Sequence, residues 1–284
     1  MSGKPLVYFD SAATALKPQV VIDAEIEYYT SYTSNIHRGV YELSQHATDA
    51  FENVRQIIAD FLHAPSSDTI VFTKSATEAM NLVASSFAQA YLTTGDEVLI
   101  TAMEHHANII PWQLACERYG AVLKVLPVTM DGELDWDNLP SLISDKTKII
   151  AMAHISNVLG TVNNVAKMTS IAHERNIPVI IDGSQAAPHI AIDVQALDCE
   201  FYVFTGHKAF GPTGVGVLYG KKEWLDALPP YQGGGDMIEQ VTFEKSTFKK
   251  APAKFEAGTP NIAGVIGLGA ALKWFKSLTI VEIE

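Results

Sequence analysis

Short apolar runs alternate with amphipathic stretches along most of this chain, beginning near residue 68. Strand-like runs cover residues 69–73, 97–101, 122–128, 148–155, 179–182, 201–204 and 215–219, and helical stretches cover 77–92, 108–119, 139–144 and 165–175. Strands that alternate with helices predict an α/β fold with a mostly parallel central sheet flanked by helices. The last strands lack full helices between them, so we expect one strand at that end to run antiparallel.

The first 66 residues have a different pattern from the rest. Apolar spacing predicts helices at 19–32 and 48–62, with a loop at 35–39 between them. We therefore divide the chain into an N-terminal helical segment, residues 1–66, and a large domain, residues 67–284. A last helix is expected at 264–278.

Composition narrows the class of protein. Charged residues make up 18% of the 284 positions, below the roughly 25% of typical soluble domains, which suggests an oligomer interface or a face meant for further chain. The net charge of −12 argues against nucleic acid or an anionic membrane as partner. The start of the chain has no signal-peptide pattern and no apolar run reaches transmembrane length, so we expect a soluble, cytoplasmic protein.

Polar residues follow five of the predicted strands. Ligands of open α/β sheets bind outside the carboxyl ends of the strands, so these residues are expected to meet. They are Ser75, Ala76 and Thr77 after the first strand, His105 after the second, Asn157 after the fourth, Asp182 and Gln185 after the fifth, and Thr205, His207 and Lys208 after the sixth. Each alone has an ordinary explanation, such as a helix cap, a core histidine or a surface lysine. Together they indicate one flat, phosphorylated, aldehyde-bearing ligand.

Lys208 and Asp182 carry the chemistry of this hypothesis. A lysine in a tight turn can form a Schiff base with an aldehyde such as pyridoxal phosphate (PLP) if its pKa is lowered. A carboxylate that keeps the pyridine nitrogen protonated makes the PLP ring an electron sink. The two cysteines, Cys116 and Cys199, have no metal-ligand spacing and are expected to be ordinary buried thiols, so no metal site is predicted.

Several runs give the sequence a familiar appearance. They are YFDSAAT (8–14), NIHRG (35–39), MEHHAN (103–108), SNVLG (156–160), DGSQA (182–186), GHK (206–208) and EAGTPN (256–261). With these runs the chain resembles, from about residue 6 onward, the PLP-dependent cysteine desulfurases of the SufS/CsdA type, in the class V aminotransferase-like family. The resemblance implies the type I fold of PLP-dependent transferases, a PLP-binding large domain at 67–284, and a homodimer.

The resemblance also implies a role for each candidate residue. Lys208 would carry PLP and move protons, Asp182 would pair with the ring nitrogen, and His105 would stack on the ring. The other implied contacts are Gln185 and Asn157 with the ring oxygen or the substrate, Ala76, Thr77, Thr205 and His207 with the phosphate, Thr259 with the phosphate of a partner subunit, and His37 and Arg38 at the substrate entrance.

The activity implied by the resemblance is release of alanine from L-cysteine or L-selenocysteine, with sulfur passed through a persulfide to a sulfur-acceptor protein for iron–sulfur cluster assembly. Relatives continue into a small C-terminal domain with the persulfide-forming cysteine, to which neither Cys116 nor Cys199 corresponds. We therefore expect that domain to be absent here and desulfuration of cysteine by this chain to be poor. Two alternatives stay open, a PLP-binding fragment without activity and another aminotransferase or lyase of the same family.

Overall fold

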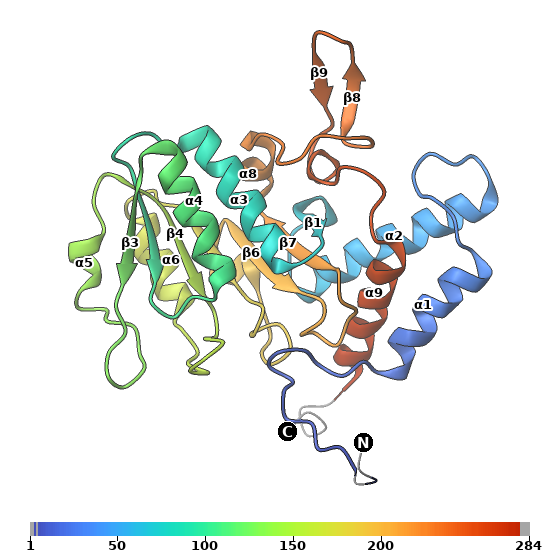
Figure 1. Ribbon diagram of the computed structural model, residues 1–284, viewed down its shortest axis with the longest axis horizontal. Helices are drawn as coiled ribbons and strands as arrows, with labels where there is room; N and C mark the ends of the chain where they lie inside the picture. Colours follow the sequence, from blue (N-terminus) through green and yellow to red (C-terminus); the bar gives the residue numbers. More distant parts are fainter. Residues whose placement is uncertain (1–2, 4, 279–284) are drawn as a thin grey trace.

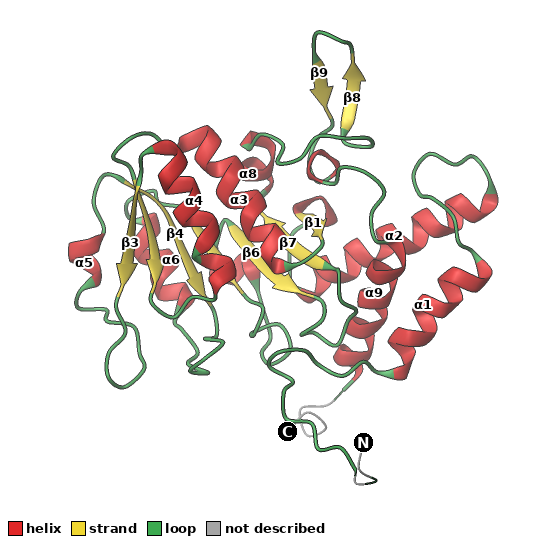
Figure 2. Ribbon diagram, viewed as in Figure 1, coloured by secondary structure: helices red, strands yellow, loops and turns green. Residues whose placement is uncertain are grey.

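A computed structural model describes residue 3 and residues 5–278 of the chain. Its centre is a seven-stranded sheet with the order β1-β7-β6-β5-β4-β2-β3 (Figure 2). The strands are β1 (Ile70–Thr73), β2 (Glu97–Thr101), β3 (Val122–Leu126), β4 (Thr147–Ala153), β5 (Val179–Asp182), β6 (Phe201–Thr205) and β7 (Gly216–Gly220). Only β7 runs antiparallel to its neighbours, β1 and β6. The predicted mostly parallel sheet with one reversed strand is confirmed.

Helices cover both faces of this sheet (Figure 1). They are α1 (Gln19–Ser31), α2 (Glu42–Phe61), α3 (Ala76–Tyr91), α4 (Ile110–Tyr119), α5 (Leu139–Leu142), α6 (Val165–His173), α7 (Val194–Leu197), α8 (Lys222–Ala227) and α9 (Ile262–Ser277), with single 3-10 turns η1 (Ser67–Thr69), η2 (His106–Asn108) and η3 (Ala253–Phe255). Apolar residues of α3, α4 and α8 form one core, and those of α1, α2, α6 and α9 form the other.

The strands supply both cores by alternation. On β6, Phe201 and Val203 belong to the core beneath α3 and α4, whereas Tyr202 and Phe204 belong to the opposite core. Successive side chains of a strand point to opposite faces, so a strand buried on both faces is apolar at every position. This explains why the central strands are continuous apolar runs in the sequence.

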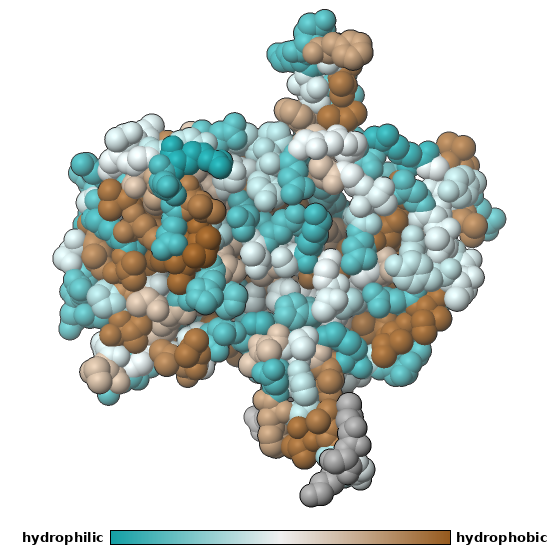
Figure 3. Space-filling model, viewed as in Figure 1, coloured by the Kyte–Doolittle hydropathy of each residue, from teal (hydrophilic) through white to brown (hydrophobic). Residues whose placement is uncertain are grey.

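Apolar side chains are exposed at many positions, among them residues of α1 and α4. Ile26 and Tyr29 are exposed on α1, and Leu114 is exposed on α4. The edge strand β3, which follows α4, is itself half-exposed. Figure 3 shows brown areas over α1 and over α4 and β3. This exposed apolar surface agrees with the low fraction of charged residues in the sequence, 18%.

Several predicted boundaries were wrong. Helix α2 begins at Glu42 rather than at residue 48, because Ser44 and Ala47 are already buried in its first turns. Strands β3 and β4 end two residues early, and Val128 and Ile155 make only isolated bridges. Helix α5 is also shorter than expected.

A two-stranded hairpin was not predicted at all. It is formed by β8 (Ile238–Val241) and β9 (Ser246–Phe248), and it projects away from the body of the molecule (Figure 1). Val241 and Phe243 are exposed, so no buried face imposes an apolar alternation on the hairpin sequence. None of the helices in the described residues is long and apolar enough to cross a membrane.

Strand β7 makes a close backbone approach to the start of α3. A Cβ atom at Gly216 would lie 2.2 Å from the carbonyl carbon of Ser75 and 2.5 Å from its Cα. Both atoms belong to the backbone, so a side chain at position 216 would have to displace the first turn of α3.

We predict that Gly216→Ala lowers the free energy of unfolding by roughly 1–3 kcal/mol, the usual cost of overpacking. Gly233→Ala is the matched control, because no atom lies within 4 Å of a Cβ built there. Urea unfolding followed by circular dichroism measures both. Equal stability of the two variants would disprove the close approach.

Candidate active site

A cavity of about 330 Å³ lies at the carboxyl ends of the strands. Strand β7 is antiparallel to both β1 and β6, so β1 points the same way as β6 and its carboxyl end reaches the same edge of the sheet. The cavity wall therefore receives residues that follow β1, β2, β4, β5 and β6. Among them are Ala76, Thr77, His105, Asn157, Asp182, Gln185, Thr205, His207 and Lys208.

Lys208 is half-buried in the turn after β6. Its Nζ donates to Asn157 Oδ1 over 2.9 Å, and the same oxygen accepts from Gln185 Nε2 at 2.6 Å. Burial lowers the pKa of Lys208, while the carboxylate of Asp182 opposes this effect. At neutral pH a larger fraction of this amine is therefore uncharged than of a surface lysine, and an uncharged amine is a nucleophile.

Asp182 is the last residue of β5 and is 7% exposed. Its Oδ1 accepts from the Ser184 amide at 2.9 Å, and this is the one hydrogen bond that other described residues donate to its carboxylate. A buried carboxylate is stable when a cation or several donors compensate its charge. The arrangement therefore leaves capacity for a donor or a protonated ring nitrogen from a ligand in the cavity.

The first turn of α3 forms the anion-binding end of the cavity. Ser75 caps this turn by accepting from the Glu78 amide at 3.1 Å, and Glu78 in return accepts from the Lys74 amide at 2.6 Å. The amides of Ala76 and Thr77 lie at the positive end of the helix dipole. Such a helix start binds phosphate and similar anions.

Thr205 provides independent support for an anion at this place. It is the last residue of β6, and its hydroxyl is buried without a hydrogen-bond partner among the described residues. Leaving a buried polar group unpaired is costly. Because Thr205 lines the cavity, an acceptor group of a ligand would satisfy it.

His105 lies on the cavity wall after β2. Its Nδ1 accepts from the Ala107 amide at 3.1 Å, so the proton of the neutral imidazole resides on Nε2. Burial, assisted by the nearby Lys208 ammonium, lowers the pKa of His105. The ring is therefore neutral at physiological pH and can stack on a flat ligand.

Glu104 is a buried residue of the site that the sequence interpretation missed. Its carboxylate accepts from Thr101 Oγ1 at 2.6 Å, from Asn108 Nδ2 at 2.6 Å and from the Ala153 amide at 2.8 Å. These donors belong to the end of β2, to η2 and to the end of β4. Glu104 thus joins the strand end that carries His105 to the strand end that leads to Asn157. A charged residue in a polar loop gives no sequence signal of burial.

Burial raises the pKa of Glu104 to about 7, above its ordinary value of 4.5, although its hydrogen bonds act in the opposite direction. The folded state then binds a proton more tightly than the unfolded state. This favours folding below pH 4.5, and the contribution is lost as the pH rises through 7.

We therefore predict that Glu104→Gln changes the pH dependence of stability. Relative to this variant, the wild type should lose up to about 3 kcal/mol of unfolding free energy between pH 4.5 and pH 7. Denaturant unfolding at several pH values measures the difference. A difference that does not change with pH would contradict the raised pKa.

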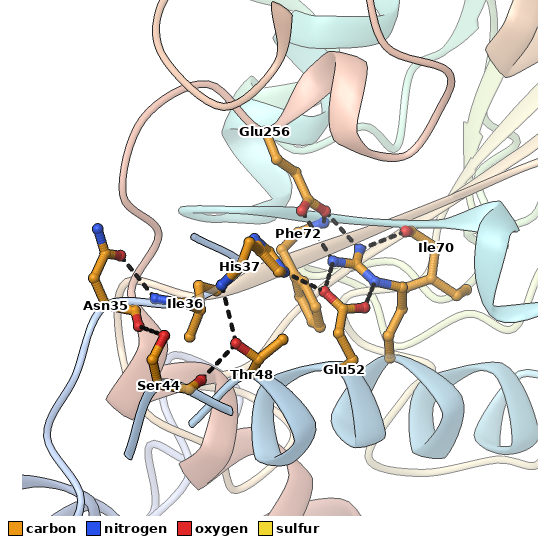
Figure 4. A network of polar contacts seen from close by, with 10 residues as sticks. Asn35, Ile36, His37, Ser44, Thr48, Glu52, Ile70, Phe72 and Glu256 are labelled. Atoms are coloured by element: carbon orange, nitrogen blue, oxygen red, sulfur yellow. Dashed lines mark hydrogen bonds and ion pairs between the residues drawn. The ribbon is translucent and has the colours of Figure 1, made fainter. Parts of the chain in front are cut away.

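Three predicted site residues lie outside the cavity. His37 Nε2 contacts Glu52 Oε1 at 2.9 Å, and the backbone amide of His37 donates to Thr48 (Figure 4). Arg38 Nε lies 2.6 Å from Asp236 Oδ1. Thr259 is exposed and lines a different cavity, of about 430 Å³, between β1 and the start of α9. Within a single chain, these three residues therefore do not reach the cavity that contains Lys208.

The two cysteines take no part in the cavity wall. Both Cys116 and Cys199 are buried, as predicted. Burial raises the pKa of Cys116 to about 11 and that of Cys199 still further above its usual range. Neither thiol is therefore a thiolate at neutral pH. No group of three or more His, Cys, Asp or Glu residues in the described ranges could hold a metal ion.

Comparison with known proteins shows which proteins this chain resembles. The family model for class-V aminotransferases matches residues 7–284. A cysteine desulfurase of Enterobacter sp. (strain 638) is 52% identical over the whole chain, which spans 70% of the length of that relative. The crystal structure of the Escherichia coli cysteine desulfurase CsdA has a TM-score of 0.89 and 44% identity, covering 95% of this chain and 68% of that one.

A third comparison concerns the cofactor. A structure of the cystine C–S lyase C-DES, in a mutant form with glycine covalently linked to its PLP cofactor, has a TM-score of 0.85 and 25% identity. The match covers 97% of this chain and 72% of that one.

Proposed function

The chain belongs to the class-V aminotransferase family, and we propose that it is a PLP-dependent cysteine desulfurase whose reacting lysine is Lys208. The observation that carries this proposal is the convergence in one cavity of Lys208, Asp182, the unpaired hydroxyl of Thr205 and the start of α3. These features lie at the ends of three different strands, and together they match the aldehyde, the ring nitrogen and the phosphate of one ligand.

The cavity residues fit PLP. The volume of about 330 Å³ is within the range of small-molecule sites, roughly 300–1,000 Å³. The amides of Ala76 and Thr77 and the hydroxyl of Thr205 would hold the phosphate, and Asp182 would hold the ring nitrogen. When bound, PLP supplies an electron sink for charge that develops on the substrate. His207 and Gln185 line the same wall.

The chain's own residues would then transfer protons and orient the substrate. The amine of Lys208 would hold the cofactor through its aldehyde group and, when free, would take a proton from the substrate and return it. Neutral His105 would lie beside the cofactor ring and would offer its Nε2 proton. Asn157, already hydrogen-bonded to Lys208 and Gln185, orients the substrate side of the cavity.

A thiolate must take up the sulfur of the substrate. Neither Cys116 nor Cys199 provides this thiolate, because both are buried away from the cavity. We propose that a thiol R–SH attacks the substrate sulfur, so that L-cysteine and R–SH give alanine and the persulfide R–S–SH. In the cell the persulfide would pass its outer sulfur to a sulfur-acceptor protein that serves iron–sulfur cluster assembly. L-selenocysteine is a second proposed substrate, and a cytoplasmic homodimer is the proposed working form.

Alanine release tests the proposed function. With PLP, L-cysteine and an added small thiol, we expect alanine to form, and we expect Lys208→Ala to reduce the rate at least about 100-fold. Without the thiol the rate should be low. Lys222→Ala, which removes a surface lysine paired with Asp226, is the control. Equal rates in the Lys208→Ala and control variants would refute the proposal.

Thr205→Val tests the phosphate site by two opposite effects. In the absence of PLP its free energy of unfolding should equal or exceed that of the wild type, because an unpaired buried hydroxyl is removed. Its affinity for PLP should fall about tenfold or more, since a hydrogen bond to a charged group is lost.

The matched control is Thr169→Val. The Thr169 hydroxyl is buried and donates to the Val165 carbonyl, so this change should affect stability and not affinity. Fluorescence titration with PLP and urea unfolding give both quantities. An affinity of Thr205→Val equal to that of the wild type would exclude Thr205 from the phosphate site.

A further inference from the structure

The three predicted site residues outside the cavity lie on two segments that share one buried residue, Arg55. One segment is the loop at 35–39, which contains His37, and the other is the run at 256–261, which contains Thr259. Arg55 reaches both segments through a carboxylate, Glu52 for one and Glu256 for the other. Figure 4 labels these two carboxylates.

All five N–H donors of the Arg55 guanidinium are satisfied. Nε and Nη2 donate to Glu52 over 2.8 and 3.2 Å, and Nη1 and Nη2 donate to Glu256 over 2.6 and 3.0 Å. Nη1 also donates to the Ile70 carbonyl at 2.9 Å. The guanidinium lies 4.5 Å from the centre of the Phe72 ring, and its side chain is 5% exposed. Arginine with two bidentate carboxylates in such surroundings has a fixed geometry.

The Arg55–Glu256 pair also occupies the open edge of the sheet. Among the described residues, strand β1 pairs with β7 on one side only, so the backbone groups on its other side have no strand partner there. The Ile70 carbonyl accepts from Arg55, and the Phe72 amide donates to Glu256 Oε1 at 2.7 Å. The two side chains thus take the place of a further strand. In this way the run at 256–261 is fixed to β1, 184 residues earlier in the chain.

The loop at 35–39 is fixed to the same point. Burial alone would raise the pKa of Glu52, but hydrogen bonds from His37 and Arg55 lower it to about 2. Glu52 is therefore ionised throughout the physiological range and holds both partners. His37 has a left-handed backbone with φ 68°, a conformation that costs free energy in a residue with a side chain and needs support from its surroundings.

We propose that Arg55 and Glu256 are positioning residues that hold His37 and Thr259 ready to complete the cavity of a second copy of the chain. The proposal rests on the homodimer of the proposed function. Within one chain neither residue lines the cavity of Lys208, and both are exposed. Val40 and Tyr41, which follow the His37 loop, are exposed apolar residues suited to burial at an interface. In a two-fold dimer each chain would serve the cavity of the other.

Glu256→Gln is the first test. Glutamine has the same shape, and its oxygen can still accept from the Phe72 amide, but the charged pair with Arg55 is lost. If the positioned state becomes about tenfold less populated, the apparent affinity for PLP falls about tenfold. Glu117→Gln, an exposed change on α4, is the control and should bind PLP like the wild type. A Glu256→Gln chain with wild-type affinity would overturn the proposal.

A mixed dimer distinguishes positioning in the partner from general damage. Chains with Lys208→Ala and chains with Glu256→Gln, carrying different affinity tags, are expressed together and the mixed species is isolated. Its one site with Lys208 receives Thr259 from the chain with intact Glu256. We therefore expect that site to bind PLP with wild-type affinity, detected by the near-visible absorption of the bound cofactor. Affinity as weak as in the Glu256→Gln dimer would overturn the proposal.

Two further measurements separate the possible failures. Sedimentation of the wild-type chain as a monomer, at concentrations where PLP is fully bound, would disprove the homodimer and with it this proposal. Weak binding by a mixed species that does sediment as a dimer would disprove the positioning role alone. If Glu256→Gln does not fold, Arg55→Lys, which keeps the charge but loses the bidentate geometry, replaces it in the same mixing experiment with the same expected rescue.

Discussion

The direction of the strands in one sheet is the constraint on which the site depends. Six strands point the same way because β7 alone is reversed between β1 and β6. Had β1 also been reversed relative to β6, the turn with Ala76 and Thr77 would lie at the opposite edge from Lys208. Strand β7 also passes close to the start of α3 at Gly216, where only a glycine leaves room for the backbone of Ser75. Sheet topology thus determines which side chains can act on one ligand.

Compensation of buried charge is the second principle in this molecule. Asp182, Glu104 and Arg55 are all buried, and each stands at a junction between elements. Glu104 accepts three hydrogen bonds and Arg55 donates five, whereas Asp182 accepts one from the described residues. Glu104 and Arg55 therefore serve to hold segments of the chain together. Asp182 has remaining capacity, as expected of a residue that faces a ligand.

The sequence predicts the sheet and the cavity well because both depend on local patterns. Continuous apolar runs identify the central strands, and the position directly after each run places Lys208, Asp182 and Thr205 at one edge. Other features depend on distant contacts. Glu256 meets Arg55 across 201 residues, and the hairpin of β8 and β9 buries no face, so neither leaves a periodic signal. The resemblance to a family identified Thr259 and His37. It assigned Thr259 to the phosphate of a partner subunit, but it did not indicate that His37 also lies outside the cavity of its own chain.

Identification of the lysine that binds PLP covalently tests the central claim most directly. Lys17 is the natural competitor, because burial also lowers its pKa and its Nζ lies 2.9 Å from the His207 carbonyl. The PLP-loaded chain is reduced with borohydride, digested and mapped by mass spectrometry. The account predicts one modification, at Lys208, because this lysine lines the cavity and Lys17 does not. Modification at Lys17, or distributed over surface lysines, would contradict it.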